Sequence, residues 1–487
     1  MRNILKPCIS FVVTCLLMPA CNSFLEVQPV SVASEAAFYK TSQDALVATN
    51  GCYNALLDIY RGSTHWLFSE VMADDATDPD VAIDNFTFDA TNGNVETFWR
   101  LHYVGIARCN TLIGRIENIP MDEALKTRLQ LEARYLRAYY YFNLVQLYGD
   151  VPLTLQEVKG QDISFPARSP AIEVYRQIAT DLTAAEGLPV SHPAPETGRA
   201  TRGAAKALLA KVYLAQRNWQ QAAAKAREVM DLAAYRLLSS YADVFAVQNR
   251  NSAESIFEVQ FGRGGQVGTG NPVTGFFFQQ FATAGSGDIV TGIAGSNGEG
   301  RMIPTSEFVN LFDTNDPRRD ASVRTFYIRA TGNRRDTVRI NHTIKYQDPQ
   351  ATVGGGGASG NGSENGWRVL RYADVLLMYA EALNELGGGN PLALEAVNQV
   401  RRRARGANPA TVLPDLAGLS QADLREAIYK ERRVELSFEG HRWFDLTRTG
   451  RTLDALKGKN IQPRNLLLPI PQRERDLNAN LTQNTGY

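Results

Sequence analysis

Small and aromatic side chains recur at a fixed spacing near the middle of the chain, and this pattern strongly restricts the fold. Ala210, Tyr213, Trp219 and Ala222 are separated by three, six and three positions. The spacing fits two antiparallel helices with a tight turn near Arg217, because small residues let helices approach and aromatic residues fill the gaps between them. Such a pair buries a continuous core only when further pairs stack on it. The sequence therefore predicts a mainly α-helical protein.

The helix pair resembles a tetratricopeptide repeat, and other parts of the chain fit the same plan. Residues 380–393 give a second, looser copy, and residues 131–148 and 427–438 have the pattern of partner helices. Between the helical parts, residues 236–366 are rich in Gly, Asn, Thr and Phe, with one strand-like alternation at 256–261. We expect a tetratricopeptide-like helical repeat scaffold with a large irregular, loop-rich insertion that contains short strands.

The beginning of the chain has the features of a targeting signal. Arg2 and Lys6 precede an apolar stretch at 9–17 that is too short to span a bilayer. Residues 17–21 resemble a bacterial lipobox, in which Cys21 becomes the lipidated first residue of the mature protein. A plain signal peptide with an incidental cysteine is the alternative. Since no other stretch has the roughly 18 apolar residues of a spanning helix, we expect a soluble body tethered to a membrane through Cys21.

Local composition divides the chain into successive segments of one compact body. These are a lipoprotein signal peptide at 1–20, an N-terminal helix and loop segment at 21–100, a first helical-repeat block at 101–235, the variable insertion at 236–366, a second helical-repeat block at 367–450 and a loop-rich tail at 451–487. The 51 basic and 51 acidic side chains give a formal net charge of zero. A balanced chain has no overall field that attracts nucleic acid, so we expect no nucleic-acid partner.

Several segments, taken in order, resemble the SusD/RagB family of outer-membrane lipoproteins of Bacteroidota. They are CNSFLEVQP (21–29), LRAYYYF (136–142) with YGDVP (148–152), DPRRD (316–320), LRYADVLLMYAEA (370–382), ERRVEL (431–436), EGHRWFDL (439–446), and LPIP (468–471) with the tail 478–487. The resemblance implies four helical repeat units and a variable lobe. It also implies a SusC-like TonB-dependent barrel as partner, capped by the lipoprotein, and ligands that are usually glycans and sometimes peptides.

The sequence lacks the motifs of common catalytic and cofactor sites. It has no HExxH pair, GxSxG elbow or Walker A loop, and the glycine-dense stretch 262–270 lacks the third Gly of a dinucleotide-binding loop. Glu435 and Glu439 lie at helical spacing from Arg432, which predicts ion pairs rather than catalysis. A calcium site at 313–316 would lack the glycine and terminal Glu of an EF-hand. We therefore expect no enzyme activity, no cofactor and no metal, with a glycosidase as the enzyme alternative.

Aromatic residues in loops are the candidates for ligand contact. A sugar site needs flat aromatic platforms with polar groups at their edges, and loop aromatics are the ones that no core requires. The predicted ligand-binding residues are Trp66, Phe86, Phe88, Phe276, Phe277, Phe278, Asp74 and Asp75. For each aromatic residue, packing under a long loop is the alternative.

These features together predict a protein of the cell surface, anchored by lipid in the outer membrane. Its predicted function is to capture an oligosaccharide or polysaccharide and deliver it to a SusC-like TonB-dependent transporter. The same scaffold binding peptides for uptake is one alternative. A tetratricopeptide adaptor for protein partners is another, although it would explain neither the lipobox nor the insertion.

Overall fold

The computed structural model describes residues 38–158, 165–262, 281, 299–331, 334–348 and 363–487. The predicted lipidation residue Cys21 and the candidates Phe276, Phe277 and Phe278 lie outside these residues. Within them, no helix is both long enough and apolar enough to cross a membrane. The described chain is mostly helical, with a few short strands, so the predicted fold class is confirmed.

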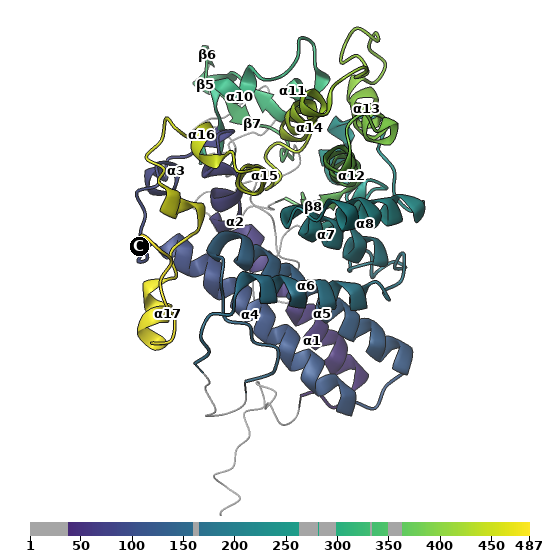
Figure 1. Ribbon diagram of the computed structural model, residues 1–487, viewed down its shortest axis with the longest axis vertical. Helices are drawn as coiled ribbons and strands as arrows, with labels where there is room; N and C mark the ends of the chain where they lie inside the picture. Colours follow the sequence, from purple (N-terminus) through teal and green to yellow (C-terminus); the bar gives the residue numbers. More distant parts are fainter. Residues whose placement is uncertain (1–37, 159–164, 263–280, 282–298, 332–333, 349–362) are drawn as a thin grey trace, which may run out of the picture.

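The first helices pack on one another in the order of the sequence, from the lower part to the middle of Figure 1. They are α1 (Ser42–Arg61), α4 (Gly93–Arg115), α5 (Glu123–Tyr148), α6 (Ala171–Ala185), α7 (Arg202–Ala215) and α8 (Trp219–Asp231). Short elements join α1 to α4: α2 (Thr64–Trp66), the π-helix η2 (Leu67–Val71), β1 (Ala76–Thr77) and α3 (Val81–Asp84), with η3 (Ile116–Asn118) after α4. Cys52 on α1 and Cys109 on α4 are buried free thiols.

The predicted helix pair is α7 and α8, and local signals set its ends. Thr201 caps α7 by accepting a hydrogen bond from the Ala204 amide, and Asn218 caps α8 in the same way. Arg217, in the turn between them, has a φ of 56°. Ala210 and Ala222 are fully buried, whereas the two aromatic residues of the pattern are half-buried against the core. The small residues thus lie where the helices approach most closely.

The second helical block continues the stack across the insertion. It consists of α12 (Tyr372–Leu386), α13 (Pro391–Arg405) and α14 (Gln421–Glu435). α12 packs directly on α8, although about 140 residues separate them in the chain. One scaffold interrupted by an insertion therefore describes the molecule, as the sequence predicted.

The described insertion contains only short elements. These are η4 (Ala242–Phe245), η5 (Val247–Asn249), β2 (Ser255–Val259), β3 (Ile303–Pro304), α10 (Ser306–Val309), α11 (Pro317–Ser322), β4 (Val323–Arg324), β5 (Tyr327–Thr331), β6 (Arg334–Val338), β7 (His342–Thr343) and β8 (Trp367–Arg371). Of these, β5, β6, β7, α10 and α11 lie near the top of Figure 1 and β8 lies in the middle. The described strands form four antiparallel pairs, β1–β3, β2–β8, β4–β7 and β5–β6. Strand pairing thus attaches the insertion to the helical scaffold at two places, at β1 and beside α12, which follows β8 directly.

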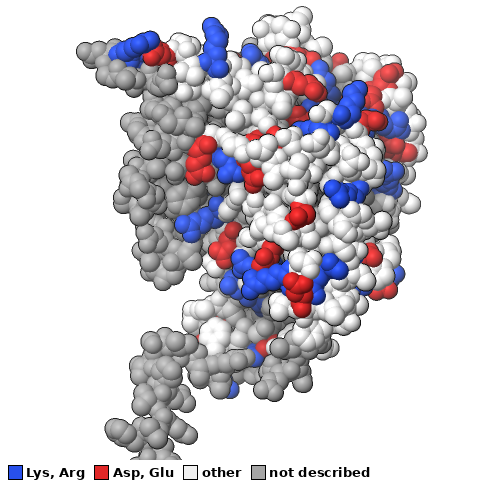
Figure 2. Space-filling view, turned by 90° about the vertical axis from the view of Figure 1, so that its left-hand side faces the viewer, with Lys and Arg blue, Asp and Glu red and all other residues white. Residues whose placement is uncertain are grey.

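The C-terminal segment returns to the N-terminal helices along the left side of Figure 1. It comprises α15 (Arg442–Thr449), α16 (Thr452–Ala455), η6 (Pro463–Leu466) and α17 (Gln472–Leu477). The Leu468 amide donates to the Leu147 carbonyl at 2.6 Å, and α17 packs on α4. On the face seen in Figure 2, acidic and basic side chains lie beside one another rather than in separate areas.

Candidate functional site

Trp66 is buried in helical structure. It ends α2, where the chain continues directly into η2, and its side chain has no exposed surface. Its ring packs edge-to-face on Phe281, with 5.5 Å between ring centroids, and the Arg301 guanidinium lies 5.1 Å from its centroid. The expectation that Trp66 lies in a loop is therefore wrong. The ring instead connects a helix of the scaffold to the insertion, where burial of its large apolar surface stabilises the junction.

The described phenylalanine candidates are buried as well. Phe86 and Phe88 are 3% and 4% exposed, and the Phe86 ring lies 6.0 Å from that of Trp443. Both side chains are therefore packed inside the protein, which is the alternative that the sequence left open. Ligand contact by any of these aromatic residues stays a prediction.

Asp74 and Asp75 are held in buried ion pairs. Asp74 accepts hydrogen bonds from Arg442 Nε at 2.7 Å and Nη2 at 2.8 Å, and Asp75 accepts one from Arg433 Nε at 2.6 Å. Burial opposes ionisation of Asp74, but Arg442 and Arg433 outweigh it and lower its pKa. Burial raises the pKa of Asp75 in spite of Arg433. The structure thus gives both carboxylates protein partners, and a role in ligand binding stays a prediction.

A second set of ion pairs joins segments that resemble the SusD/RagB motifs to other parts of the chain. Arg371 Nη1 donates to Glu435 Oε1 at 2.7 Å, and its Nε donates to Glu439 Oε2 at 2.6 Å. Arg403 also binds Glu435, and Lys345 Nζ donates to Glu439 Oε1 at 2.9 Å. Further members of this network are Glu254, Asp316, Arg318, Arg401 and Glu431. Five cations therefore face five anions.

The charges of this network determine the protonation of Glu435. Burial works against ionisation of Glu435, but three arginines prevail and hold its pKa well below the usual range. A carboxylate stabilised in this way is a poor proton acceptor or donor near neutral pH.

Asp313 pairs with Lys430 and Asp316 with Arg318, and the described residues contain no cluster of three potential metal ligands. The carboxylates of Asp313 and Asp316 thus have cationic partners within the protein.

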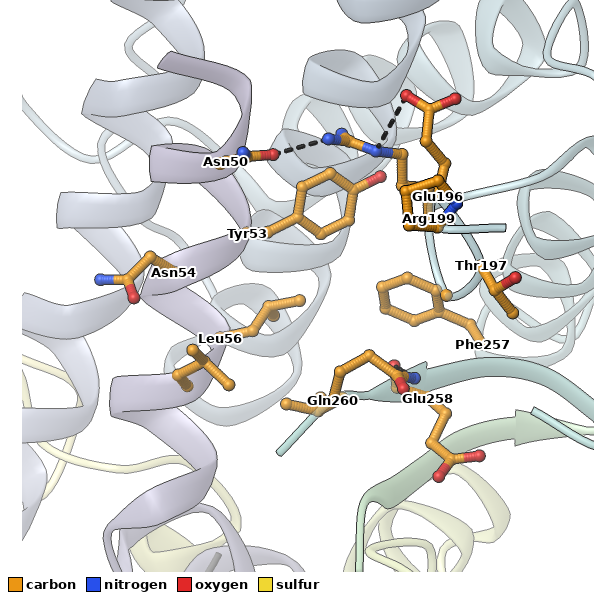
Figure 3. A pocket seen from close by; sticks show the side chains of 14 residues that line it. Asn50, Tyr53, Asn54, Leu56, Glu196, Thr197, Arg199, Phe257, Glu258 and Gln260 are labelled. Atoms are coloured by element: carbon orange, nitrogen blue, oxygen red, sulfur yellow. Dashed lines mark hydrogen bonds and ion pairs between the residues drawn. The ribbon is translucent and has the colours of Figure 1, made fainter. Parts of the chain in front are cut away.

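A cleft of about 570 Å³ opens between α1, the loop 195–199 and β2 (Figure 3). Such a volume is within the range of about 300–1,000 Å³ that is typical of small-molecule sites. The side chains that line it combine apolar and aromatic surface with amides and charges. They include Asn50, Tyr53, Asn54, Leu57, Arg199, Phe257 and Gln260.

Hydrogen bonds fix the aromatic wall of this cleft. The Tyr53 hydroxyl donates to Glu132 Oε2 and accepts from the Ala200 amide, both at 2.9 Å. Arg199 donates to the same Glu132 oxygen at 2.8 Å and to Asn50 Oδ1 at 2.6 Å, and its guanidinium lies 5.6 Å from the Tyr53 ring centroid. Burial, with the Glu132 charge, raises the pKa of Tyr53 well above its usual value. The ring is therefore a neutral, immobilised surface.

The loop that forms another wall is positioned by a glycine. Gly198 has a φ of 98°, which disfavours other residues, and a side chain there would meet Gln260 at 3.0 Å. This close approach brings Thr197 and Arg199 against the end of β2. The amide of Gln260 is fixed in turn by reciprocal hydrogen bonds with Asn251, at 2.8 and 2.9 Å.

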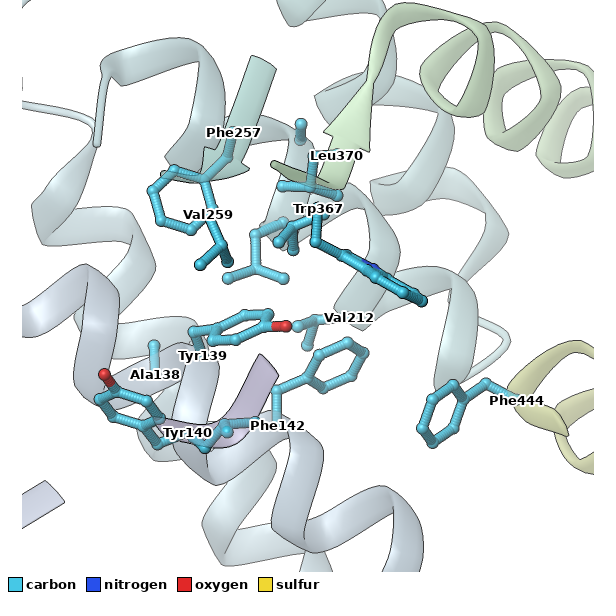
Figure 4. Packing of buried hydrophobic residues seen from close by; sticks show 14 of the residues in the cluster. Ala138, Tyr139, Tyr140, Phe142, Val212, Phe257, Val259, Trp367, Leu370 and Phe444 are labelled. Atoms are coloured by element: carbon cyan, nitrogen blue, oxygen red, sulfur yellow. The ribbon is translucent and has the colours of Figure 1, made fainter. Parts of the chain in front are cut away.

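β2 and β8 fill the space that the repeat helices enclose. Phe257 and Val259 of β2 and Trp367 and Leu370 of β8 pack beside Tyr139 and Val212 (Figure 4). The sequence alternates like a short strand at 256–261, and residues 256–259 are all buried. A tetratricopeptide adaptor binds its partner in an open groove, and here the chain itself occupies that space.

Comparisons with known proteins agree with this architecture. The chain matches two family models, one described as starch-binding associating with outer membrane over residues 25–214 and one described as the SusD family over residues 327–465. It is 31% identical to SusD-like protein P2 of Formosa agariphila, over 98% of this chain and 99% of that protein. The chain belongs to the SusD family.

Solved structures of SusD-family proteins have the same fold. A laminarin binding SusD-like protein superposes with a TM-score of 0.79 at 28% identity, covering 92% of this chain and all of the other. A SusD homolog from Bacteroides thetaiotaomicron gives a TM-score of 0.79 at 27% identity, covering 93% and 99%. The starch-binding protein SusD of the same organism is 22% identical over 80% of this chain and 77% of its own length.

The cleft of this SusD-family protein has no contiguous signature in the sequence. Its residues come from three distant segments, and none carries a known motif. One signal was present: Asn50, Tyr53 and Asn54 lie three and four positions apart, which places two amides and an aromatic ring on one face of α1.

Proposed function

We propose that this protein is a cell-surface lipoprotein that captures an oligosaccharide and delivers it to a SusC-like TonB-dependent transporter in the outer membrane. The observation that carries the proposal is the end-to-end match with a SusD-like protein of Formosa agariphila. The similar laminarin binding protein and the family description of starch binding support a carbohydrate ligand. The β2–β8 ribbon within the repeat helices favours this function over that of a peptide-groove adaptor.

Capture without cleavage is part of the proposal. The paired glutamates of the family-like motif, Glu435 and Glu439, are both buried and held by cations, which supports a structural role for them. Incubation of the purified protein with a bound oligosaccharide for about a day should leave the chain length of the sugar unchanged in chromatography. Shortening of the sugar that increases with protein concentration would contradict binding without turnover.

The proposal also includes a lipid anchor on Cys21. Replacing the thiol, Cys21→Ala, should release the protein from the membrane fraction, because Ala cannot carry the acyl chains that would supply the membrane affinity. The fractionation should be done in a strain without the barrel partner, with Cys52→Ala as the control substitution. Membrane association of Cys21→Ala in that strain would show that another feature anchors the protein.

Calorimetry with a panel of oligosaccharides tests the central claim. Neutral α- and β-linked glucans, other neutral hexose and pentose oligomers, acidic glycans and unstructured peptides should be compared. We expect binding of at least one neutral glycan and no binding of peptides. Binding of peptides alone would show that the protein captures peptides rather than sugars. Co-purification of a barrel from the native membrane tests delivery separately.

A further inference from the structure

We propose that the cleft between α1, the loop 195–199 and β2 is a binding site for a short neutral oligosaccharide. This inference rests on the proposed function and names a place and a ligand class for it. The cleft is separate from the ligand residues expected from the sequence, since Trp66, Phe86 and Asp74 do not line it. The assignment depends on the charges of the cleft, its free polar groups and the edge of β2.

The two arginines and two glutamates beside the loop 195–199 cancel one another in charge, and Glu258, which also lines the cleft, has its Oε1 4.0 Å from Arg368 Nε. Arg128 binds Glu196 through Nη2 at 2.7 Å, and Arg199 binds Glu132 at 2.8 Å. Each arginine also lies near the other glutamate: the distances from Arg128 Nε to Glu132 Oε1 and from Arg199 Nε to Glu196 Oε1 are both 3.7 Å. Two cations and two anions thus form a closed group with no net charge. An anionic sugar or a charged peptide end would find no uncompensated partner here, whereas a neutral ligand would not disturb the pairs.

The polar groups available to a ligand are suited to hydroxyls. Asn54 is half-buried in the cleft wall and makes no side-chain hydrogen bond within the part of the chain that the structure describes, and the same is true of the exposed Thr197. An amide both donates and accepts, so it matches the paired donor and acceptor character of sugar hydroxyls. The ring of Tyr53 and the side chain of Leu57 provide apolar surface for the C–H face of a sugar.

The edge of β2 favours a sugar over a peptide in this cleft. An extended peptide would add to a free strand edge through main-chain hydrogen bonds. Here the Glu258 carbonyl already accepts a hydrogen bond from Gln260 Nε2 at 2.8 Å, and that amide is locked by Asn251. A side chain therefore caps the edge at the place where a peptide strand would have to pair.

Protection of an introduced thiol tests the location directly. The variant Asn54→Cys places a thiol in the cleft wall, and Gln43→Cys places one on the exposed surface of the same helix, away from the cleft. The other cysteines of the described chain, Cys52 and Cys109, are buried free thiols and should not react. The rate of alkylation by a maleimide is measured with and without neutral tri- and tetrasaccharides that bind the wild-type protein in calorimetry.

We expect saturating neutral sugar to slow alkylation of Asn54→Cys at least fivefold and to leave Gln43→Cys unchanged. Asn54→Ala should weaken binding about fivefold, the usual effect of losing one hydrogen bond, with an unchanged melting temperature. If the wild-type protein binds sugar but Asn54→Cys is not protected, this inference fails and the proposed function stands. If no sugar in the panel, neutral or acidic, binds the wild-type protein, both fail. Protection by acidic glycans or peptides instead would overturn the assignment of ligand class.

Discussion

Replacing Glu435 by Gln tests whether the buried ion network holds the insertion to the second helical block. Glu435 has no exposed surface and binds Arg371, Arg403 and Arg318. Gln has nearly the same volume and can still accept a hydrogen bond, so the substitution removes one charge without opening a cavity. The network then contains five cations and four anions. Breaking a buried pair by removing one partner costs about 3–5 kcal/mol, because an uncompensated charge stays buried.

The assay is urea denaturation followed by circular dichroism, with Arg402→Gln as the matched control. Arg402 also binds two carboxylates, Glu395 and Asp415, but its side chain is 41% exposed. Solvent screens exposed pairs, so we expect the control to lose less than about 1 kcal/mol of unfolding free energy. We expect Glu435→Gln to lose at least about 3 kcal/mol near pH 7.

The pH dependence gives a second, independent readout. The pKa of Glu435 is lowered on folding, so its contribution to stability is present above the ordinary glutamate pKa and is lost as the pH falls below it. The difference in unfolding free energy between the wild type and Glu435→Gln should therefore shrink from about pH 4.5 downward. A loss no larger than that of Arg402→Gln, or a difference that stays constant with pH, would refute this reasoning.

Two further substitutions test other buried groups. Trp66→Ala should lower the unfolding free energy by about 3–5 kcal/mol, as large-to-small core changes do, and an unchanged denaturation midpoint would indicate an exposed, ligand-facing ring instead. Burial, reinforced by the Asp75 charge, raises the pKa of Glu70 to about 8. The stability that the neutral form of Glu70 contributes is therefore complete below the ordinary glutamate pKa and is lost as the pH rises through about 8. Glu70→Gln keeps the acceptor for the Gly440 amide and should be more stable than the wild type near pH 8, by up to about 3 kcal/mol. Denaturation at several pH values checks this, and a variant less stable than the wild type at pH 8 would contradict it.

The local pattern of the sequence determined the helical scaffold. The spacing of Ala210, Tyr213, Trp219 and Ala222 predicted α7 and α8 because positions three and four apart share one helix face, whatever the rest of the chain does. The same reasoning predicted helices around 131–148 and 380–393, and both are present. The SusD/RagB resemblance likewise belongs to the sequence alone, because its motifs are short, contiguous runs of residues spread over the whole chain.

Tertiary structure decided where the aromatic and charged residues lie. Trp66 follows a glycine and polar residues at 62–65, which predicts a loop, yet Phe281 and Arg301, more than 200 positions away, enclose its ring. Arg371 and Glu435 are 64 positions apart and meet only because α12 and α14 pack together. Burial and ion pairing depend on which distant segments come into contact, and a pattern that repeats within one or two helical turns carries no information about such contacts. The face of α1 in the cleft carries a signal in the sequence, but its meeting with the loop 195–199 and β2 is unpredictable from the sequence for the same reason.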